Sequence, residues 1–320
     1  MIPCTLGIDT SCYTTSLALA SEGAIVASVR RLLTVEQGER GLQQSKGVFQ
    51  HVNRLPELFD QLLAEAPEAR IDAVCVSARP RDQEGSYMPV FVAGHSFARG
   101  IAAALRVPLY ETSHQQGHVR AALVDSSVPE GGPFLALHLS GGTTEVLSVQ
   151  PDLSITLLGG SGDLNAGQLV DRVGVALGLG FPAGPALEAL AVKGEARSAF
   201  PLAASKGSVS FSGAEAQAMR LIKSGTARPE DIAAEVYSYL TRAVARLIRD
   251  GQAQTGAKHV LVSGGVASSA LLRTLLPARL KRQDIRIGLH WGRPELSGDN
   301  ACGVALIGDA HKRTELKHGR

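Results

Sequence analysis

The alternation of apolar and polar residues at the start of the chain predicts three consecutive strands joined by short turns. The predicted strands cover residues 2–9, 13–20 and 23–30. A helical spacing follows at Val52, Leu55, Leu58 and Leu62. The pattern then predicts a strand at 71–77, a helix at 90–105, a strand at 107–110 and a helix that carries His114 and His118.

A second half of the chain repeats this order. Strands are predicted at 133–139, 144–149 and 153–158, then helices that include a long one over 230–250, a strand at 259–263, a helix after Gly265, a strand at 285–289 and a final helix from Asp299. The two similar halves predict an α/β fold made by internal duplication. Because the segment 124–132 is polar and rich in turn residues, we expect domains at 1–127 and 128–320.

Three glycine-containing turns follow apolar strands, in a fixed order along the chain. They are Gly7-Ile8-Asp9-Thr10-Ser11, Leu139-Ser140-Gly141-Gly142-Thr143-Thr144 and Val262-Ser263-Gly264-Gly265-Val266-Ala267. Small residues at a strand end leave backbone N–H groups able to bind an anion, and glycine tolerates the required backbone angles. The three turns together predict a nucleotide-binding cleft between the two halves.

Composition limits the function classes. The chain has 320 residues, 44% of them hydrophobic, and 32 Lys and Arg against 30 Asp and Glu, so it can fill two cores but has no strong charge bias. Its basic clusters, which suit either phosphate contacts or a solvated surface, are Arg30-Arg31, Lys281-Arg282 and Lys312, Arg313, Lys317 and Arg320. Four scattered cysteines predict reduced thiols. With no apolar run of about 20 residues, we expect a soluble, cytoplasmic protein that does not enter membranes.

Two histidines have the spacing of metal ligands. His114 and His118 lie one helical turn apart, so both imidazoles can bind one divalent ion; two surface histidines would show the same spacing. Asp299 is a candidate third ligand, although it also suits a helix cap. His138, just before the second glycine turn, is a candidate fourth ligand or a polar residue at a strand end. A zinc peptidase is disfavoured because the HExxH glutamate is missing.

An ordered set of motifs resembles the TsaD/Gcp family of tRNA threonylcarbamoyladenosine transferases, which includes the catalytic subunit of the KEOPS complex. The motifs are Gly7-Ile8-Asp9-Thr10-Ser11-Cys12, His114 and His118, Ser140-Gly141-Gly142-Thr143-Thr144, and the segments 167–173, 177–185, 211–213, 262–267 and 299–301. The resemblance covers nearly the full length. It implies the ASKHA fold of actin, sugar kinases and chaperone ATPases, with duplicated RNase H-like domains around a nucleotide cleft.

The resemblance also implies roles for individual residues. A metal is held by His114, His118 and Asp299, and His138 occupies the place of a tyrosine ligand in archaeal members. The residues implied at the nucleotide are Ser140, Gly141, Gly142 and Thr143 by their backbone, Asp171 at the ribose, Gly167, Gly184 and Glu188 around the sugar and base, and Gly264 and Gly265 under the adenine. From its residue type alone, Asp171 also suits a helix-surface carboxylate. The family usually has Asp at the position of Glu188.

The reaction implied is transfer of a threonylcarbamoyl group from threonylcarbamoyl-AMP to N6 of the tRNA adenine next to the anticodon. The implied cofactors are one divalent metal, Fe or Zn, and ATP, AMP or the adenylate as ligand. The implied partners are tRNA and proteins of the TsaB and TsaE types. The TsaB-type partner is expected to pack helix on helix against the first domain.

Several segments depart from the family pattern. Residues 77–89, which include Arg79, Arg81, Asp82 and Glu84, replace a glycine-rich loop. The two arginines suit either a bound phosphate or carboxylate, or a salt-bridged loop. The departures predict a divergent paralogue, with another carbamoyl acceptor as an alternative. Two further alternatives are a non-catalytic, nucleotide-binding assembly partner and a small-molecule kinase with Asp82 or Glu84 as its base.

Overall fold

The computed structural model describes residues 1–35, 42–197 and 199–318 and divides the chain into two compact units. The first unit contains Met1–Val124 together with Gly298–Arg320, and the second contains Asp125–Ser297. This division departs from the predicted domains 1–127 and 128–320 at the C-terminal segment, which belongs to the first unit. The physical reason is close packing of helix α9 (Cys302–Lys317) on the first sheet.

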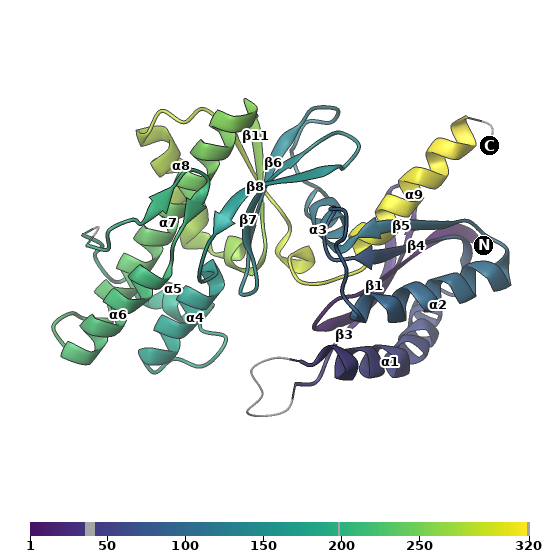
Figure 1. Ribbon diagram of the computed structural model, residues 1–320, viewed down its shortest axis with the longest axis horizontal. Helices are drawn as coiled ribbons and strands as arrows, with labels where there is room; N and C mark the ends of the chain where they lie inside the picture. Colours follow the sequence, from purple (N-terminus) through teal and green to yellow (C-terminus); the bar gives the residue numbers. More distant parts are fainter. Residues whose placement is uncertain (36–41, 198, 319–320) are drawn as a thin grey trace. The chain divides into compact units, whose positions relative to one another are not determined.

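The first unit is a five-stranded sheet covered by helices on both faces (Figure 1). Its strands, in the order β3-β2-β1-β4-β5, are β1 (Ile2–Thr10), β2 (Thr14–Ser21), β3 (Ala24–Leu32), β4 (Ala69–Arg79) and β5 (Leu109–Ser113). β1, β2 and β3 are antiparallel neighbours, whereas β4 and β5 continue the sheet in parallel. Helices α1 (Gln44–Glu65) and α2 (Val90–Leu105) contact each other and the sheet, and α3 (His114–Ala122) packs on α9.

The alternation along β1 separates the core from the functional face. Leu6 and Ile8 are fully buried in the core that includes α1 and α2. Gly7 lies on the opposite side, where a Cβ atom would collide with the backbone of α9 at Ala301 and Ala305. Because side chains alternate along a strand, Asp9 shares the face of Gly7. β1 therefore sends its polar end toward α3 and α9.

The second unit is built on a seven-stranded sheet in the order β12-β11-β6-β7-β8-β10-β9. Its strands are β6 (Phe134–Leu139), β7 (Thr144–Val149), β8 (Ile155–Ser161), β9 (Ala204–Ser205), β10 (Ser208–Val209), β11 (His259–Ser263) and β12 (Gly288–Trp291). Its helices are α4 (Ala166–Ala176), α5 (Gly184–Ala191), α6 (Ser212–Ser224), α7 (Pro229–Thr255) and α8 (Ala270–Arg282), with short 3₁₀ segments η1 (Gly265–Ser268) and η2 (Pro294–Leu296).

Helix α7 organises the core of the second unit. Its buried residues, which include Tyr237, Tyr239 and Leu240, join a cluster with residues of β6 and α4. α7 also packs on α5 and α8. The pairing β8-β7-β6-β11-β12 repeats β3-β2-β1-β4-β5, with the same change from antiparallel to parallel neighbours. The predicted duplication and α/β class are confirmed.

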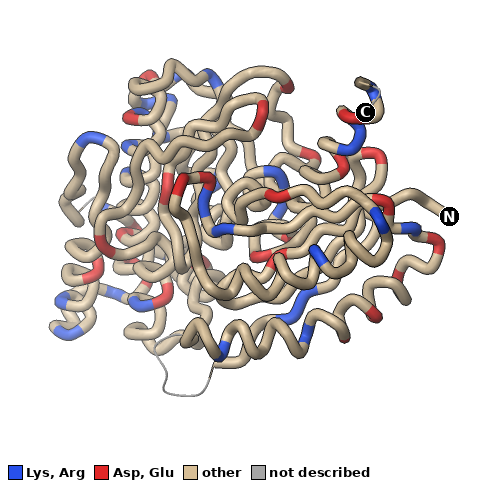
Figure 2. Tube along the Cα trace, turned by 45° about the vertical axis from the view of Figure 1, so that its right-hand side comes forward, with Lys and Arg blue, Asp and Glu red and all other residues tan. Residues whose placement is uncertain are grey.

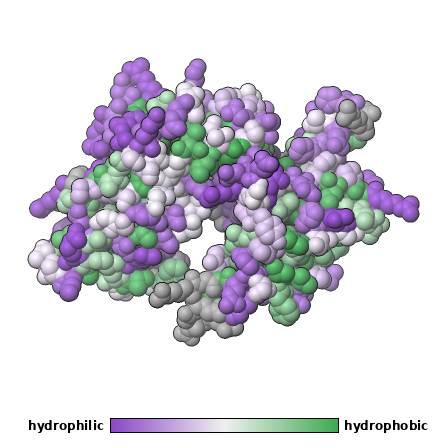
Figure 3. Space-filling model, viewed as in Figure 1, coloured by the Kyte–Doolittle hydropathy of each residue, from purple (hydrophilic) through white to green (hydrophobic). Residues whose placement is uncertain are grey.

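The predicted strands and helices are present, but the strands predicted at 107–110 and 285–289 lie two to three residues later, at Leu109–Ser113 and Gly288–Trp291. One shift matters: the last helix begins at Cys302 rather than at Asp299. All four cysteines are free, as predicted. Among the described residues, no helix combines the length and apolar character needed to cross a membrane. Figure 3 shows hydrophilic and hydrophobic residues intermixed over the face in view.

Candidate functional site

Two histidines begin helix α3 directly after strand β5. Ser113 caps the helix: its side chain accepts a hydrogen bond from the backbone N–H of Gln116 at 3.1 Å. The cap fixes the first turn, so His114 and His118 lie one turn apart on one face. Their rings are 4.4 Å apart between centroids and nearly perpendicular. The helical arrangement predicted for these histidines is confirmed.

Asp299 reaches the histidines from the segment before α9. Helices α3 and α9 approach closely where Gly117 meets Gly303, since a Cβ atom on Gly303 would collide with the carbonyl of Gly117. Ala301, not Asp299, is the N-cap of α9, and the side chain of Asn300 accepts a hydrogen bond from the N–H of Cys302 at 3.0 Å. The alternative that Asp299 is only a helix cap is therefore wrong.

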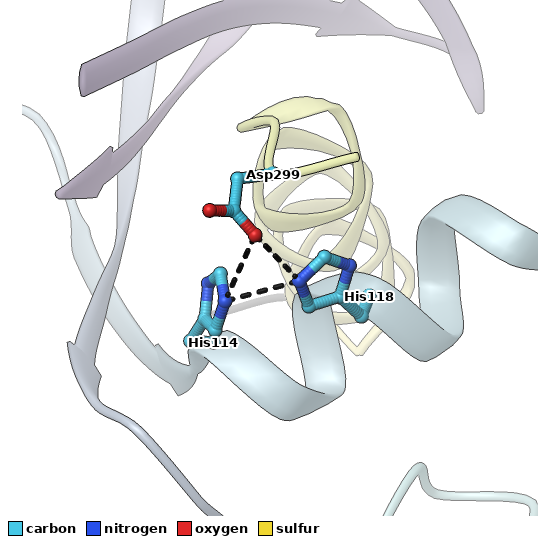
Figure 4. A group of neighbouring side chains, drawn as sticks. All are labelled: His114, His118 and Asp299. Carbon is cyan, nitrogen blue, oxygen red and sulfur yellow. Dashed lines mark hydrogen bonds and ion pairs between the residues drawn. The ribbon is translucent and has the colours of Figure 1, made fainter. Parts of the chain in front are cut away.

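The three side chains converge on one point within the first unit (Figure 4). The Nε2 atoms of His114 and His118 are 3.0 Å apart. Asp299 Oδ1 is 3.1 Å from Nε2 of His118 and 3.5 Å from Nε2 of His114. Ligands at bond lengths of 2.0–2.2 Å around one ion lie about 2.8 to 3.6 Å from one another. The donor set therefore fits a single divalent ion with open coordination positions.

The charges of His114 and Asp299 shift each other's pKa in opposite directions. Burial opposes the charged form of His114, but Asp9 and Asp299 outweigh it and hold its pKa well above the usual value. Burial likewise opposes the charged form of Asp299, yet hydrogen bonds with His114 and His118 hold its pKa well below the usual range. The carboxylate is thus kept ionised, as a metal ligand requires, whereas a metal bound to His114 would displace the proton that the raised pKa favours.

Residues of the first glycine turn surround these ligands. Asp9 Oδ1 lies 2.9 Å from His114 Nδ1. Ser11 Oγ donates to Asp299 Oδ2 at 3.0 Å, and Thr14 Oγ1 does so at 3.4 Å. Sequence reasoning assigned this turn to nucleotide binding and missed its contacts with His114 and Asp299. One signal was available, because Asp9 is the only charged residue of β1.

His138 belongs to the second unit. It lies on β6, and its Nδ1 is 3.4 Å from Ser263 Oγ on the neighbouring strand β11. The group of three potential ligands in the first unit does not include it. A role for His138 as a fourth ligand stays a prediction.

A cavity of about 460 Å³ lies within the second unit. Six residues predicted at the nucleotide line it: Gly141, Gly167, Asp171, Gly184, Glu188 and Gly265. Asp171 Oδ1 accepts a hydrogen bond from the N–H of Ala183 at 2.8 Å, and Glu188 Oε1 accepts from the N–H of Leu271 at 2.7 Å. Both carboxylates are therefore held in place by the backbone.

Four predicted residues, Ser140, Gly142, Thr143 and Gly264, are not in that lining. Ser140 and Thr143 close a turn, with the N–H of Ser140 donating to the Thr143 carbonyl at 2.8 Å. Gly264 has φ +96°, a conformation that favours glycine, and a Cβ atom there would strike Leu139. Tyr237 also lines the cavity and was missed, because it reads as a core residue of α7.

The loop that departs from the family pattern lies beside the metal ligands. The carbonyl of Pro80 accepts a hydrogen bond from the N–H of Gln115 at 3.0 Å, one residue after His114. Arg79 and Asp82 form an ion pair at 3.2 Å, as the salt-bridge alternative predicts. The loop is thus fixed to the start of α3.

Basic residues are interspersed with acidic ones along the chain (Figure 2). Lys312 Nζ lies 2.8 Å from Asp72, and Arg313 Nε lies 3.0 Å from Asp309. Arg31 pairs with Glu57. Arg320 lies outside the described residues. These pairs favour a structural use of the C-terminal charges over phosphate binding.

Solved structures that resemble this chain define its class. The activator of 2-hydroxyisocaproyl-CoA dehydratase from Clostridium difficile has a TM-score of 0.55 at 16% identity, over 98% of this chain and 97% of that chain. A ROK family glucokinase from Streptomyces griseus has a TM-score of 0.54 at 12% identity, over 97% and 99%. T. kodakarensis HypF gives 0.60 at 14%, over 99% and 48%. The chain therefore has the ASKHA-type α/β fold, as expected.

Sequence comparison identifies the family within that class. The model of the TsaD family, described as tRNA N6-adenosine threonylcarbamoyltransferase, matches residues 40–306. A relative of that name from Thermus thermophilus is 33% identical over 310 residues, 94% of this chain and 90% of its own. One from Aromatoleum aromaticum is 31% identical over 314 residues, 95% and 90%. The chain belongs to the TsaD family, which confirms the resemblance found in its motifs.

Proposed function

We propose that this chain is a metal-dependent transferase that moves the threonylcarbamoyl group of threonylcarbamoyl-AMP to N6 of the tRNA adenine next to the anticodon. The observation that carries the proposal is the convergence of His114, His118 and Asp299 within 3.5 Å of one another in a chain of the TsaD family. This donor set argues against the non-catalytic alternative, because a scaffold does not need a half-buried, ionised ligand group.

The first unit provides the electrophilic part of the reaction. An exocyclic adenine amine is a weak nucleophile, so the carbonyl that it attacks needs polarisation. A divalent metal held by His114, His118 and Asp299 supplies a Lewis acid for this purpose. Two neutral imidazoles and one carboxylate leave a net positive charge on such a centre, and they suit Fe or Zn. The same donor set disfavours a small-molecule kinase, whose Mg²⁺ takes oxygen ligands.

The second unit provides the adenylate site. The backbone N–H groups of Ser140 and Thr143 are engaged within their own turn, so Gly141 and Gly142 remain to donate to the AMP phosphate. Negative charge that develops on the leaving phosphate is stabilised by such preorganised donors. One oxygen of Asp171 is held by Ala183, and the carboxylate accepts hydrogen bonds from the ribose hydroxyls. tRNA, TsaB-type and TsaE-type partners and a cytoplasmic location are parts of the same proposal.

A second acceptor is the alternative that one observation favours. The segment 77–89 replaces a glycine-rich loop, contains the Arg79–Asp82 ion pair, and is hydrogen-bonded to α3 beside His114. A charged loop at this place changes the surface that an acceptor meets. The metal and adenylate chemistry would then be retained while the amine acceptor differs.

The test is transfer of labelled threonylcarbamoyl from its adenylate to unmodified tRNA, with and without a TsaB-type partner, followed by mass spectrometry of the nucleosides. We expect modified adenosine from the wild type and a loss of more than about 100-fold in the His114→Ala, His118→Ala variant, since even residues behind metal ligands are worth 10- to 100-fold. The matched control is His259→Ala, His290→Ala, which removes another histidine pair, 3.0 Å apart in the second unit.

Three outcomes separate the candidates. Product that needs His114 and His118 supports tRNA modification. Adenylate consumption without modified adenosine points to another acceptor, which a screen of small amines then identifies. Equal loss in both histidine variants contradicts a specific role of the metal ligands.

A further inference from the structure

Asp9 is a fully buried carboxylate that the proposed reaction does not use directly. It lies near the end of β1, and its side chain is 0% exposed. Its Oδ1 accepts hydrogen bonds from His114 Nδ1 at 2.9 Å and from Ser77 Oγ. Its Oδ2 has no hydrogen-bond partner among the described residues. Burying a carboxylate with an unsatisfied oxygen is costly, so a core strand would not retain it for packing alone.

The contact between Asp9 and His114 determines which ring nitrogen of His114 is available to bind a metal. A neutral imidazole carries one N–H, and a carboxylate opposite Nδ1 places that proton on Nδ1. The Nε2 lone pair is then directed to the point shared with His118 and Asp299. Histidine ligands of metals generally donate their other N–H to a carboxylate or carbonyl group, which fixes the ring and raises its basicity.

Asp299 is held in a corresponding way. Ser11 Oγ donates to its Oδ2 at 3.0 Å, and Thr14 Oγ1 donates to the same atom at 3.4 Å. Oδ1 is the oxygen that faces the two histidines. The end of β1 and the turn that follows it thus contact the far side of two proposed ligands, His114 through the Asp9 carboxylate and Asp299 through the Ser11 hydroxyl.

We infer that Asp9 is a positioning residue that orients His114 for metal binding, with Ser11 in the same role toward Asp299. This inference rests on the metal centre of the proposed function, but it concerns metal affinity and not transfer. It reassigns the first glycine turn from nucleotide binding to support of the metal ligands. Gly7 contributes by allowing β1 to approach α9, the helix that follows Asp299.

The test measures metal binding directly. Metal-free wild type, Asp9→Asn, Asp9→Ala and Ser11→Ala proteins are titrated with Zn²⁺ against a chromophoric chelator, and Co²⁺ absorption reports the ligand geometry. We expect Asp9→Ala to weaken Zn²⁺ binding about 10- to 100-fold. Asp9→Asn retains the acceptor oxygen without the charge, so its loss is smaller, and both Asp9 variants alter the Co²⁺ spectrum.

A matched control separates positioning from structure. Asp309 is also 0% exposed in the first unit, and it accepts from the N–H of Gly23 at 2.8 Å and pairs with Arg313, with no contact to the metal ligands. Asp309→Asn is expected to lower the unfolding temperature while leaving Zn²⁺ affinity within about twofold. If Asp9→Ala fails to fold, Asp9→Asn and Ser11→Ala carry the test.

The outcomes are decisive in both directions. Loss of Zn²⁺ affinity at Asp9 but not at Asp309 supports positioning. Unchanged affinity and an unchanged Co²⁺ spectrum in all Asp9 and Ser11 variants overturns it, as does a wild type that binds neither metal. Tight Zn²⁺ binding that depends on Asp9, in a protein that transfers nothing to tRNA, retains the inference and removes the proposed function.

Discussion

The two units share the order of five strands, yet the residues that follow the first strand of each differ in kind. In the first unit, side chains at the end of β1 and in the turn after it contact the proposed metal ligands: Asp9 contacts His114, and Ser11 contacts Asp299. In the second unit, the equivalent turn between β6 and β7 is Ser140-Gly141-Gly142-Thr143 and exposes backbone. The two units thus present the same strand end twice. Side chains at the first suit contacts with the proposed metal ligands, whereas glycines at the second suit contacts made by the backbone.

If the glycine turn of the second unit binds the nucleotide through its backbone, an added side chain next to that turn should weaken binding. The substitution with the largest expected effect is Gly167→Ala. A Cβ atom there would lie 2.6 Å from the N of Gly141, too close for any real contact, so the turn must shift. Overpacking of this kind costs about 1 to 3 kcal/mol. We expect AMP affinity, measured by calorimetry, to fall about 10- to 100-fold with Zn²⁺ affinity unchanged.

The control for this substitution is Gly132→Ala, where a Cβ atom meets nothing within 4 Å. It should leave both affinities unaltered. An AMP affinity that Gly167→Ala does not change would mean that the glycine turn is no part of the nucleotide site.

Asp171→Asn examines the charged contact that we expect at the ribose in the second unit. The variant retains the oxygen that accepts from Ala183 and removes the negative charge offered to the ribose. Hydrogen bonds to charged groups contribute about 1.5 to 3 kcal/mol, so AMP should bind about 10-fold more weakly, and 2′-deoxy-AMP should lose less. Equal weakening of both nucleotides would place Asp171 away from the ribose.

The smallest effect is expected from Asp163→Asn. This variant tests whether a carboxylate fixed by hydrogen bonds also stabilises the fold of the second unit. Asp163 accepts from the N–H groups of Phe211 and Ser212 at 2.8 and 3.1 Å, and from Ser210 Oγ at 2.6 Å. Although burial opposes it, these bonds hold its pKa well below the usual range. Since the residue is exposed, screening limits the stabilisation to about 1 kcal/mol.

The sign of the pH dependence follows from the depressed pKa. The contribution of Asp163 is complete above the unfolded-state pKa of about 3.9 and is lost as pH falls through the lower folded value. Urea unfolding should therefore separate wild type from Asp163→Asn at pH 7 and show the difference shrinking below about pH 4. A constant difference down to pH 2 would show that ionisation plays no part.

The sequence predicted the strands and the pairing of His114 with His118, because strand alternation and helical spacing depend only on residues close together along the chain. Asp299 is 181 residues from His118 along the chain, so only its motif could suggest that it joins the histidines. The position of α9 was not predictable from periodicity, since close contacts at Gly7, Gly303 and Gly308 decide it. Asp9 was hidden for a related reason: one acid in an apolar strand does not reveal what lies opposite.

The return of the last segment to the first unit also orders events during synthesis. The ribosome produces His114 and His118 long before it reaches Asp299, 181 residues after His118, which at 5–20 residues per second is a delay of about 10 to 40 s. Until α9 has been synthesised, β1 lacks one of its covering helices, and the two histidines lack the carboxylate of Asp299. The nascent protein therefore cannot bring together the three proposed metal ligands until the second unit has been made.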